Sequence, residues 1–174
     1  MAENLNYDIP GSRCYKDSVA YCNKYGRLYD WATAMALDSS CNNTTCEDQV
    51  NTPHQGICPP GWHIPSNADW QELVNSAGGE STAGTKLKAA SDWIGVYIDT
   101  DDYKFSALPG GMCGASGSKL ECVTPFGITG IWHSSNEDSK SKAYHLILVY
   151  YSGIAKIESS VGKNALVSVR CLKD

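Results

Sequence analysis

Hydrophobic residues spaced three or four positions apart mark the expected helices of this chain. The clearest series ends at Gly78-Gly79 and consists of Trp70, Leu73, Val74 and Ala77. Ser66, with Asp69 three residues later, forms a capping-box pattern in front of it, so we expect a helix that begins after Ser66. A second helix is expected over residues 30–37, and a short third one over residues 84–90 with Leu87 facing inward.

The second helix has its own start signal. Asp30 is a suitable N-cap, and Trp31, Ala34 and Met35 then fall on one helical face. A polar segment follows over residues 38–55. Residues 56–65 contain too many prolines for a helix and predict an extended connection to the helix after Ser66.

From residue 93 onward, the pattern changes to short apolar runs separated by glycine turns. In residues 144–151 both alternating sets of positions are apolar, which indicates a strand covered on both faces in the middle of a sheet, and Ser152-Gly153 supplies a hairpin turn after it. Helices followed by an antiparallel sheet predict an α+β domain. The expected strands cover residues 4–7, 27–29, 104–108, 130–134, 143–151, 154–159 and 166–172.

Length and charge narrow the class of protein. The 174 residues fit one domain, and the net charge of −5 opposes contact with the phosphate backbone of nucleic acid. The longest apolar run, residues 146–151, is far shorter than the roughly 20 residues of a membrane-spanning helix. We therefore expect a single folded domain that neither binds nucleic acid nor spans a bilayer.

The eight cysteines are an even number, and their spacing suggests a pairing. Three pairs lie close together in the sequence, and the two remaining cysteines would form a long-range bridge. So many disulfides indicate an oxidising compartment outside the cytoplasm, and because no basic and apolar leader opens the chain, we expect the export signal upstream in a longer precursor. The expected pairs are Cys14 with Cys22, Cys41 with Cys46, Cys113 with Cys122, and Cys58 with Cys171.

Two alternatives use the cysteines differently. Cys41 and Cys46, with His54 and Cys58 downstream, have a spacing that zinc sites use. A catalytic cysteine would need a free and activated thiol. Both alternatives require some of the eight to stay reduced.

Several long motifs resemble the Fibrobacter succinogenes major paralogous domain over nearly the whole chain. They are MAENLNY at residues 1–7, YGRLYDW at 25–31, GICPPGWHIPS at 56–66, FSALPGG at 105–111 and SVRC at 168–171. The resemblance implies a secreted or surface-attached bacterial protein, and it identifies the domain without assigning it an activity.

The family is also similar to the C-type lectin fold and to the core of the formylglycine-generating enzyme. This similarity implies two main helices packed on a twisted antiparallel sheet, with Cys171 anchoring the last strand in agreement with a bridge to Cys58. The calcium-dependent sugar triplets of the lectins and the reactive cysteine pair of the enzymes have no counterpart here. No catalytic residue is therefore assigned.

The first candidate binding region surrounds residues 99–102. Its carboxylates, Asp99, Asp101 and Asp102, offer the hard oxygen ligands that Ca²⁺ prefers, although a solvated acidic turn has the same composition. No cofactor is expected, and Ca²⁺ at these carboxylates is the alternative. The flanking aromatic residues could stack on sugar rings or belong to the core. They are Trp93, Tyr97 and Tyr103.

The second candidate region is the end of the strand expected at residues 130–134. It places an aromatic ring, an imidazole and several oxygen atoms at a sheet edge, where they could face a ligand or simply lie in a solvated loop. Its residues are Trp132, His133, Asn136 and Glu137. His63, inside the proline-rich motif, is expected to hydrogen-bond to the backbone instead.

These features predict an extracytoplasmic, non-catalytic binding or adhesion module for polysaccharide or a surface protein. The alternatives are an enzyme of the formylglycine-generating type, a metal-assisted hydrolase, or a structural module of a larger surface assembly. The cysteine-based enzyme needs a free thiol, and the hydrolase needs a bound metal.

Overall fold

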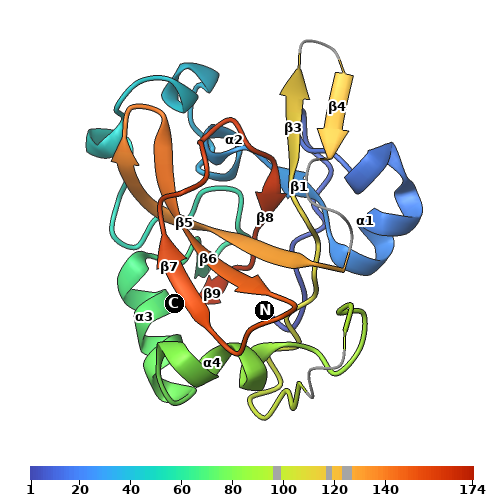
Figure 1. The fold of residues 1–174 in the computed structure, drawn as a ribbon. Helices are drawn as coiled ribbons and strands as arrows, with labels where there is room; N and C mark the ends of the chain where they lie inside the picture. The colour runs from blue at the N-terminus through green and yellow to red at the C-terminus, as the bar shows by residue number, and fades with distance from the viewer. Residues whose placement is uncertain (96–98, 117–118, 123–126) are drawn as a thin grey trace.

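A five-stranded sheet forms the centre of the computed structural model, which describes residues 1–95, 99–116, 119–122 and 127–174 (Figure 1). Its strands lie in the order β1-β8-β5-β6-β7. Their bounds are Leu28–Tyr29 for β1, Val167–Ser168 for β8, Thr129–Ser139 for β5, Lys142–Val149 for β6 and Ala155–Glu158 for β7. All neighbours are antiparallel except β5 and β8, so the α+β prediction is confirmed but the sheet is mixed, not wholly antiparallel.

Strands β5, β6 and β7 form an antiparallel meander in which β6 is interior. Trp132 of β5 lies opposite Leu146 of β6, and His133 lies opposite His145. Leu146 and His145 face opposite sides of β6, yet both are fully buried. The predicted central strand is therefore confirmed, with an end at Val149 instead of residue 151.

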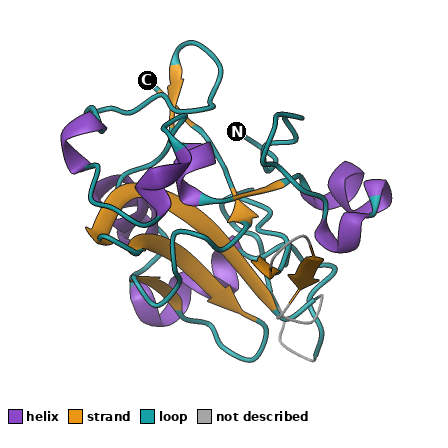
Figure 2. Cartoon of the chain, turned by 90° about the horizontal axis from the view of Figure 1, so that it is seen from above, coloured by secondary structure: helices purple, strands orange, loops and turns teal. Residues whose placement is uncertain are grey.

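Helices α3, Asn67–Ser76, and α4, Glu80–Leu87, pack on one face of this sheet (Figures 1 and 2). The capping box before α3 is present, with the Ser66 side chain accepting from Asp69 N and the Asp69 carboxylate accepting from Ser66 N. Leu87 is buried, but α4 begins four residues before the predicted start. The shared core consists of Trp70, Val74, Ala77, Ala83, Leu87, Ala107, Trp132, Leu146, Leu148 and Ala155.

The second core lies around α2, Trp31–Ala34. Asp30 caps this helix by accepting a hydrogen bond from Thr33 N. The prediction of a helix to residue 37 was wrong, because Ala36 adopts a left-handed φ of 54° and Leu37 N bonds back to Ala32 O, which closes the helix early. The core contains Tyr29, Trp31, Met35, Ile64, Ala143, Val169 and two disulfides.

Short elements complete the chain. The antiparallel pairs β2–β9 and β3–β4 lie outside the main sheet. Single-turn segments occur at Tyr15–Asp17, Ser39–Asn42 and Glu47–Gln49. The remaining bounds are Val19–Tyr25 for α1, Trp62–His63 for β2, Cys113–Ser116 for β3, Lys119–Cys122 for β4 and Leu172–Lys173 for β9.

Three strand predictions need correction. Residues 104–108 contribute only a bridge at Ala107, because Lys104 and Ser106 have positive φ angles that a strand does not accept. Residues 166–172 divide into β8 and β9, which belong to different sheets. Residues 4–7 form no strand, although Leu5 N bonds to Val169 O and Leu5 O accepts from Arg27 N.

Four disulfides connect the cysteines in the predicted pairs: Cys14–Cys22, Cys41–Cys46, Cys58–Cys171 and Cys113–Cys122. No cysteine of the chain remains free, so neither the zinc alternative nor the catalytic thiol has a sulfur available to it. The two ends of the chain lie side by side, with Met1 N donating to Cys171 O at 2.7 Å (Figure 1). Within the described residues, no helix has the length and apolar character needed to cross a membrane.

Candidate functional site

The acidic segment at residues 99–102 does not form a cluster of free carboxylates. Asp99 is buried and pairs with Lys88, with 3.0 Å between Lys88 Nζ and Asp99 Oδ1. Burial raises the pKa of the Asp99 carboxyl, and the contact with Lys88 opposes that shift. Both Asp101 oxygens accept hydrogen bonds from Ser106 at 2.7 Å. Asp102 is exposed, and no hydrogen bond or ion pair holds its carboxylate among the described residues.

The aromatic residues beside this segment have structural contacts. The Trp93 indole donates to Ala107 O at 2.9 Å, and Lys88 Nζ lies 5.2 Å from its ring centroid. The Tyr103 hydroxyl donates to Ser76 O at 2.5 Å, although 47% of Tyr103 is exposed. Tyr97 lies outside the described residues. This region therefore resembles a folded loop more than an open ligand site.

Two members of the second predicted region lie in the core. Trp132 is fully buried and donates from its indole nitrogen to Asn4 Oδ1 at 2.8 Å. His133 is also buried, with Nε2 2.8 Å from Tyr29 O, and burial lowers its pKa to about 4. Both side chains are buried in the core of the protein, and neither is exposed at an edge of the sheet.

Glu137 connects the sheet to the loop that carries the Cys41–Cys46 disulfide. Its Oε1 accepts from Cys46 N at 2.8 Å, and its Oε2 pairs with Lys163. Lys163 Nζ also donates to Cys41 O and Thr44 O, at 3.0 and 3.1 Å. Since both charged side chains are buried, this is a structural ion pair that fixes the loop against β5.

Asn136, in contrast, lies at an open groove. The groove encloses about 680 Å³ between the loop at residues 50–54, the segment from His63 to Asp69, and β5. A hollow of about 100 Å³ that also reaches Glu47 and Glu137 adjoins it. We call the two together the trough. Both parts of the trough are lined by Val50, Thr52, Ser135 and Asn136.

The walls of the trough are held by hydrogen bonds between distant segments. Asn136 Oδ1 accepts from Asn67 N, at the first turn of α3, at 2.8 Å. Ser135 N donates to Pro65 O at 2.9 Å. These bonds join β5 to the start of α3, so the groove is built before any ligand arrives.

Two histidines line the trough. His54 Nδ1 accepts from Asn51 N at 3.1 Å, which places the proton on Nε2, 2.8 Å from Met35 O. His63 lies between two carboxylates, with Nδ1 2.7 Å from Asp174 and Nε2 3.6 Å from Asp69. The expectation that His63 bonds to the backbone was wrong, because its ring nitrogens face these side chains.

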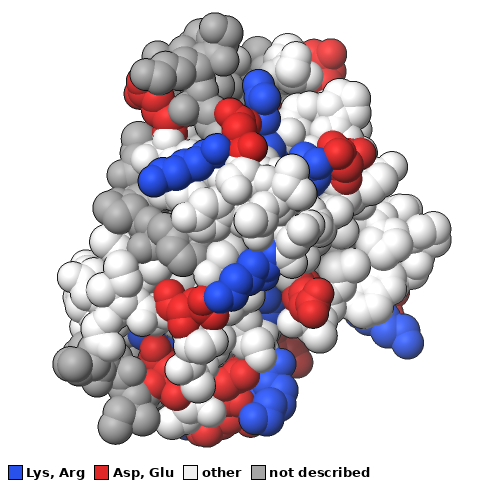
Figure 3. All heavy atoms as spheres, turned by 90° about the vertical axis from the view of Figure 1, so that its right-hand side faces the viewer, with Lys and Arg blue, Asp and Glu red and all other residues white. Residues whose placement is uncertain are grey.

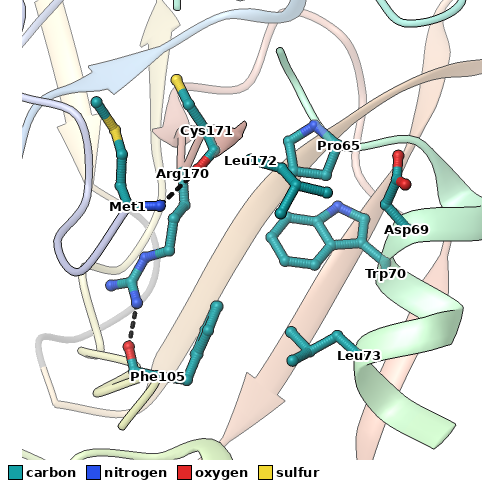
Figure 4. A pocket seen from close by; sticks show the side chains of 9 residues that line it. All are labelled: Met1, Pro65, Asp69, Trp70, Leu73, Phe105, Arg170, Cys171 and Leu172. Carbon is teal, nitrogen blue, oxygen red and sulfur yellow. Dashed lines mark hydrogen bonds between the residues drawn. The ribbon is translucent and has the colours of Figure 1, made fainter. Parts of the chain in front are cut away.

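A smaller apolar pocket of about 160 Å³ lies on the other side of Asp69 (Figure 4). Trp70, Leu73, Phe105 and Leu172 surround it, and the Asp69 carboxylate points away from its centre. Arg170 lies along its wall. The guanidinium is buried, donates to Asn4 Oδ1 and Phe105 O, and stacks 4.3 Å from the Phe105 ring centroid.

Burial lowers the pKa of Arg170 to about 10, partly offset by the charges of Asp101 and Glu3. The arginine of the SVRC motif therefore lies in the core as a structural cation. Over the described residues, no group of three or more His, Cys, Asp or Glu side chains is arranged to hold a metal ion.

Among the described residues, the face at the right-hand side of Figure 1 shows no basic patch. There, Lys and Arg side chains are interspersed with Asp and Glu (Figure 3). This distribution does not offer the clustered positive charge that nucleic-acid backbones require.

Comparison with protein families settles the relationship suggested by the motifs. The model of the Fibrobacter succinogenes major domain matches residues 1–173. The chain belongs to this family. Neither the curated proteins nor the solved structures gave a match. In this member of the Fibrobacter succinogenes major domain family, the long motifs thus reflect a relationship over essentially the whole chain.

The structure shows where the residues of these motifs lie. The proline-rich motif supplies His63, Ile64 and Ser66 to the trough, and the SVRC motif supplies Arg170 and the Cys171 bridge. Sequence reasoning found Asn136 and Glu137 but missed the loop at residues 50–54. That loop has no motif of its own, and only folding brings it opposite β5.

Proposed function

We propose that this domain is an extracytoplasmic binding module that takes polysaccharide into the trough without catalysis. The observation that carries the proposal is the preformed groove, whose lining alternates small aliphatic surfaces with amide, hydroxyl, imidazole and carboxylate groups. Such a lining suits a sugar chain, which presents hydroxyl groups around apolar ring faces.

The mode of recognition differs from stacking on aromatic rings. No Trp, Tyr or Phe is among the described residues that line the trough. Contact would come from aliphatic surfaces at Val50, Pro53 and Ala68 and from hydrogen bonds at Asn51, Asn136 and their neighbours. Affinity per sugar would be modest, and several sugars in a row would be needed.

Covalent and ionic links that hold the trough walls support a binding module that works outside the cell. The Cys41–Cys46 disulfide and the Glu137–Lys163 pair hold the loop beside the trough, and Cys58–Cys171 holds the segment leading to His63. Disulfides of this number also favour an export destination at the cell surface or in the medium. The proposal includes a C-type lectin-like arrangement of helices and sheet, which a solved structure of this domain would test.

A glycan array with the fully oxidised protein tests the function. Ala68 is exposed at the start of α3 and lines the groove, so Ala68→Trp fills the space with an indole ring. Gln71→Trp, on an exposed position of the same helix outside the groove, is the matched control. We expect retention of glycan by wild type and Gln71→Trp and loss of at least about tenfold in affinity by Ala68→Trp.

Retention that Ala68→Trp leaves unchanged would place the site elsewhere. An array and polysaccharide pull-down without any retained glycan would reject the sugar ligand and favour a surface protein as partner.

A further inference from the structure

The charged groups around the trough are unbalanced. Its lining contains no Lys or Arg among the described residues, while Glu47 lines the smaller hollow and Asp69 the larger groove. The two parts share four lining residues, so a bound chain that occupies both would lie near both carboxylates.

The other ionisable side chains that line the trough do not offset the charge of these two carboxylates. Glu137 is cancelled by Lys163 in a buried pair. His54 is neutral because its Nδ1 accepts a hydrogen bond while Nε2 is satisfied by a carbonyl. His63 can cancel only one of the two carboxylates that it contacts, Asp69 and Asp174. At neutral pH the trough therefore carries a net negative charge, with Glu47 uncompensated.

The trough also contains a hydrogen-bond acceptor that lacks a donor. Asn67 Oδ1, in the groove wall, is buried and has no donor among the described residues. An unsatisfied buried acceptor costs about 1–3 kcal/mol unless water or a ligand supplies a donor. Sugar hydroxyl, amide and ammonium groups can supply this donor, whereas a carboxylate or sulfate group placed at Asn67 Oδ1 cannot.

We propose that the trough selects glycans without acidic groups, and that it binds an amino-sugar chain at least as tightly as its neutral counterpart. This inference rests on the proposed function and adds the charge class of the ligand. Its physical basis is repulsion between the trough carboxylates and an acidic sugar, in a groove that offers no cation to compensate.

The test uses glycans that share a backbone linkage and differ in one substituent on each sugar, which sets the charge. The β-1,4-linked oligomers of glucose, glucosamine and glucuronic acid form one such series, and methyl-esterified and de-esterified polygalacturonate form another. We expect each acidic member to bind at least about fivefold more weakly than its neutral partner in low salt. In roughly 1 M sodium chloride, where the screening length is about 3 Å, the difference should shrink.

Glu47→Gln tests whether the trough is the source of the selectivity. It removes one exposed carboxylate from the trough, and we expect it to reduce the discrimination against the acidic oligomers by about twofold or more. Glu72→Gln, an equally exposed substitution outside the trough, should leave the discrimination unchanged.

The possible failures are distinct. If no glycan of any charge is retained, the proposed function is wrong. If glycans bind but an acidic member equals or exceeds its neutral partner in low salt, the function stands and the charge selectivity is rejected. Equal effects of Glu47→Gln and Glu72→Gln would also reject the trough as the source of selectivity.

Discussion

Glu137 of β5 and Lys163, 26 residues later, pair inside the protein, with side chains 3% and 0% exposed. The ammonium also lies 4.5 Å from the Trp31 ring centroid. Each charge therefore depends on the other, because both side chains are almost completely removed from solvent.

Removing one of these charges should cost much of the domain's stability. Glu137→Gln keeps an oxygen for Cys46 N but leaves the Lys163 ammonium buried without a counter-ion. We expect the free energy of unfolding to fall by about 3 kcal/mol or more in urea titrations. Glu158→Gln, in the surface pair with Lys156, should change it by less than about 1 kcal/mol. Similar decreases in the free energy of unfolding for both variants would show that the buried pair contributes no more than the surface pair.

Gly84 in α4 reverses the usual effect of a helix glycine. Alanine normally stabilises a helix interior relative to glycine by roughly 1 kcal/mol. Here a Cβ at residue 84 would lie 2.6 Å from Ile154 O and 2.7 Å from Gly153 O, both backbone atoms of the turn after β6. Gly84→Ala should therefore destabilise the domain by about 1–3 kcal/mol in thermal or chemical unfolding.

The matched control for this substitution is Gly114→Ala. A Cβ at Gly114 meets no atom of the described residues within 4 Å, so we expect a change below about 0.5 kcal/mol. Stabilisation by Gly84→Ala would mean that α4 does not pack this closely on the turn.

Acid should weaken the fold through His133. Its folded pKa of about 4 lies below the ordinary value of 6.5, so the unfolded chain binds the proton more readily. The stability this provides is complete above pH 6.5 and is lost as the pH falls toward 4, to a total of about 3 kcal/mol. Burial also lowers the pKa of His145, with repulsion from His133 as a further cause, which acts in the same direction.

Urea midpoints measured between pH 7.5 and pH 4 check this prediction. This range covers the interval between the folded pKa of His133, about 4, and its ordinary value of 6.5. His133→Gln should flatten the pH profile of the variant, so that the stability difference between wild type and variant narrows as the pH falls from 7.5 toward 4. Parallel pH profiles for the two proteins would contradict the assignment, whatever the cost of the substitution at neutral pH.

The four disulfides should differ in their contributions. In the loop-entropy model, Cys58–Cys171, with a sequence separation of 113, contributes about 5 kcal/mol, and Cys41–Cys46, with a separation of 5, about 2 kcal/mol. Paired Cys→Ser substitutions at each bridge, compared by chemical unfolding, check the order. Thiol titration of the denatured, unreduced wild type should find no free thiol; a reactive thiol would contradict the pairing.

The elements that the sequence predicted well have local causes. The capping box at Ser66 and the apolar series after it are sufficient to define α3, and cysteine proximity defines three disulfides and leaves the fourth pair by elimination. α2 was predicted too long because the turn at Ala36 has no glycine to mark it. The hairpin β3–β4 is absent from the expected strands, since its small and polar residues carry no strand pattern.

The site was harder to predict because its charges are neutralised over long distances. Asp99 and Glu137 looked like ligand-binding carboxylates, but Lys88 and Lys163 neutralise them in the fold. Nothing near Glu137 in the sequence indicates Lys163 as its partner. The trough likewise depends on residues 47–54 meeting β5, a contact between segments about 85 residues apart in the chain.

The Cys58–Cys171 bridge also determines how the domain would respond to mechanical force. A pull applied at its two ends passes through the bridge, so the chain between these cysteines cannot extend until a covalent bond breaks. The extensible length falls from roughly 600 Å to roughly 200 Å, at about 3.5 Å per residue. Under load, strands β5 to β8 and the trough wall from His63 to Asp69 would stay shielded, whereas β1 and the trough wall at residues 50–54 lie in the N-terminal third that yields.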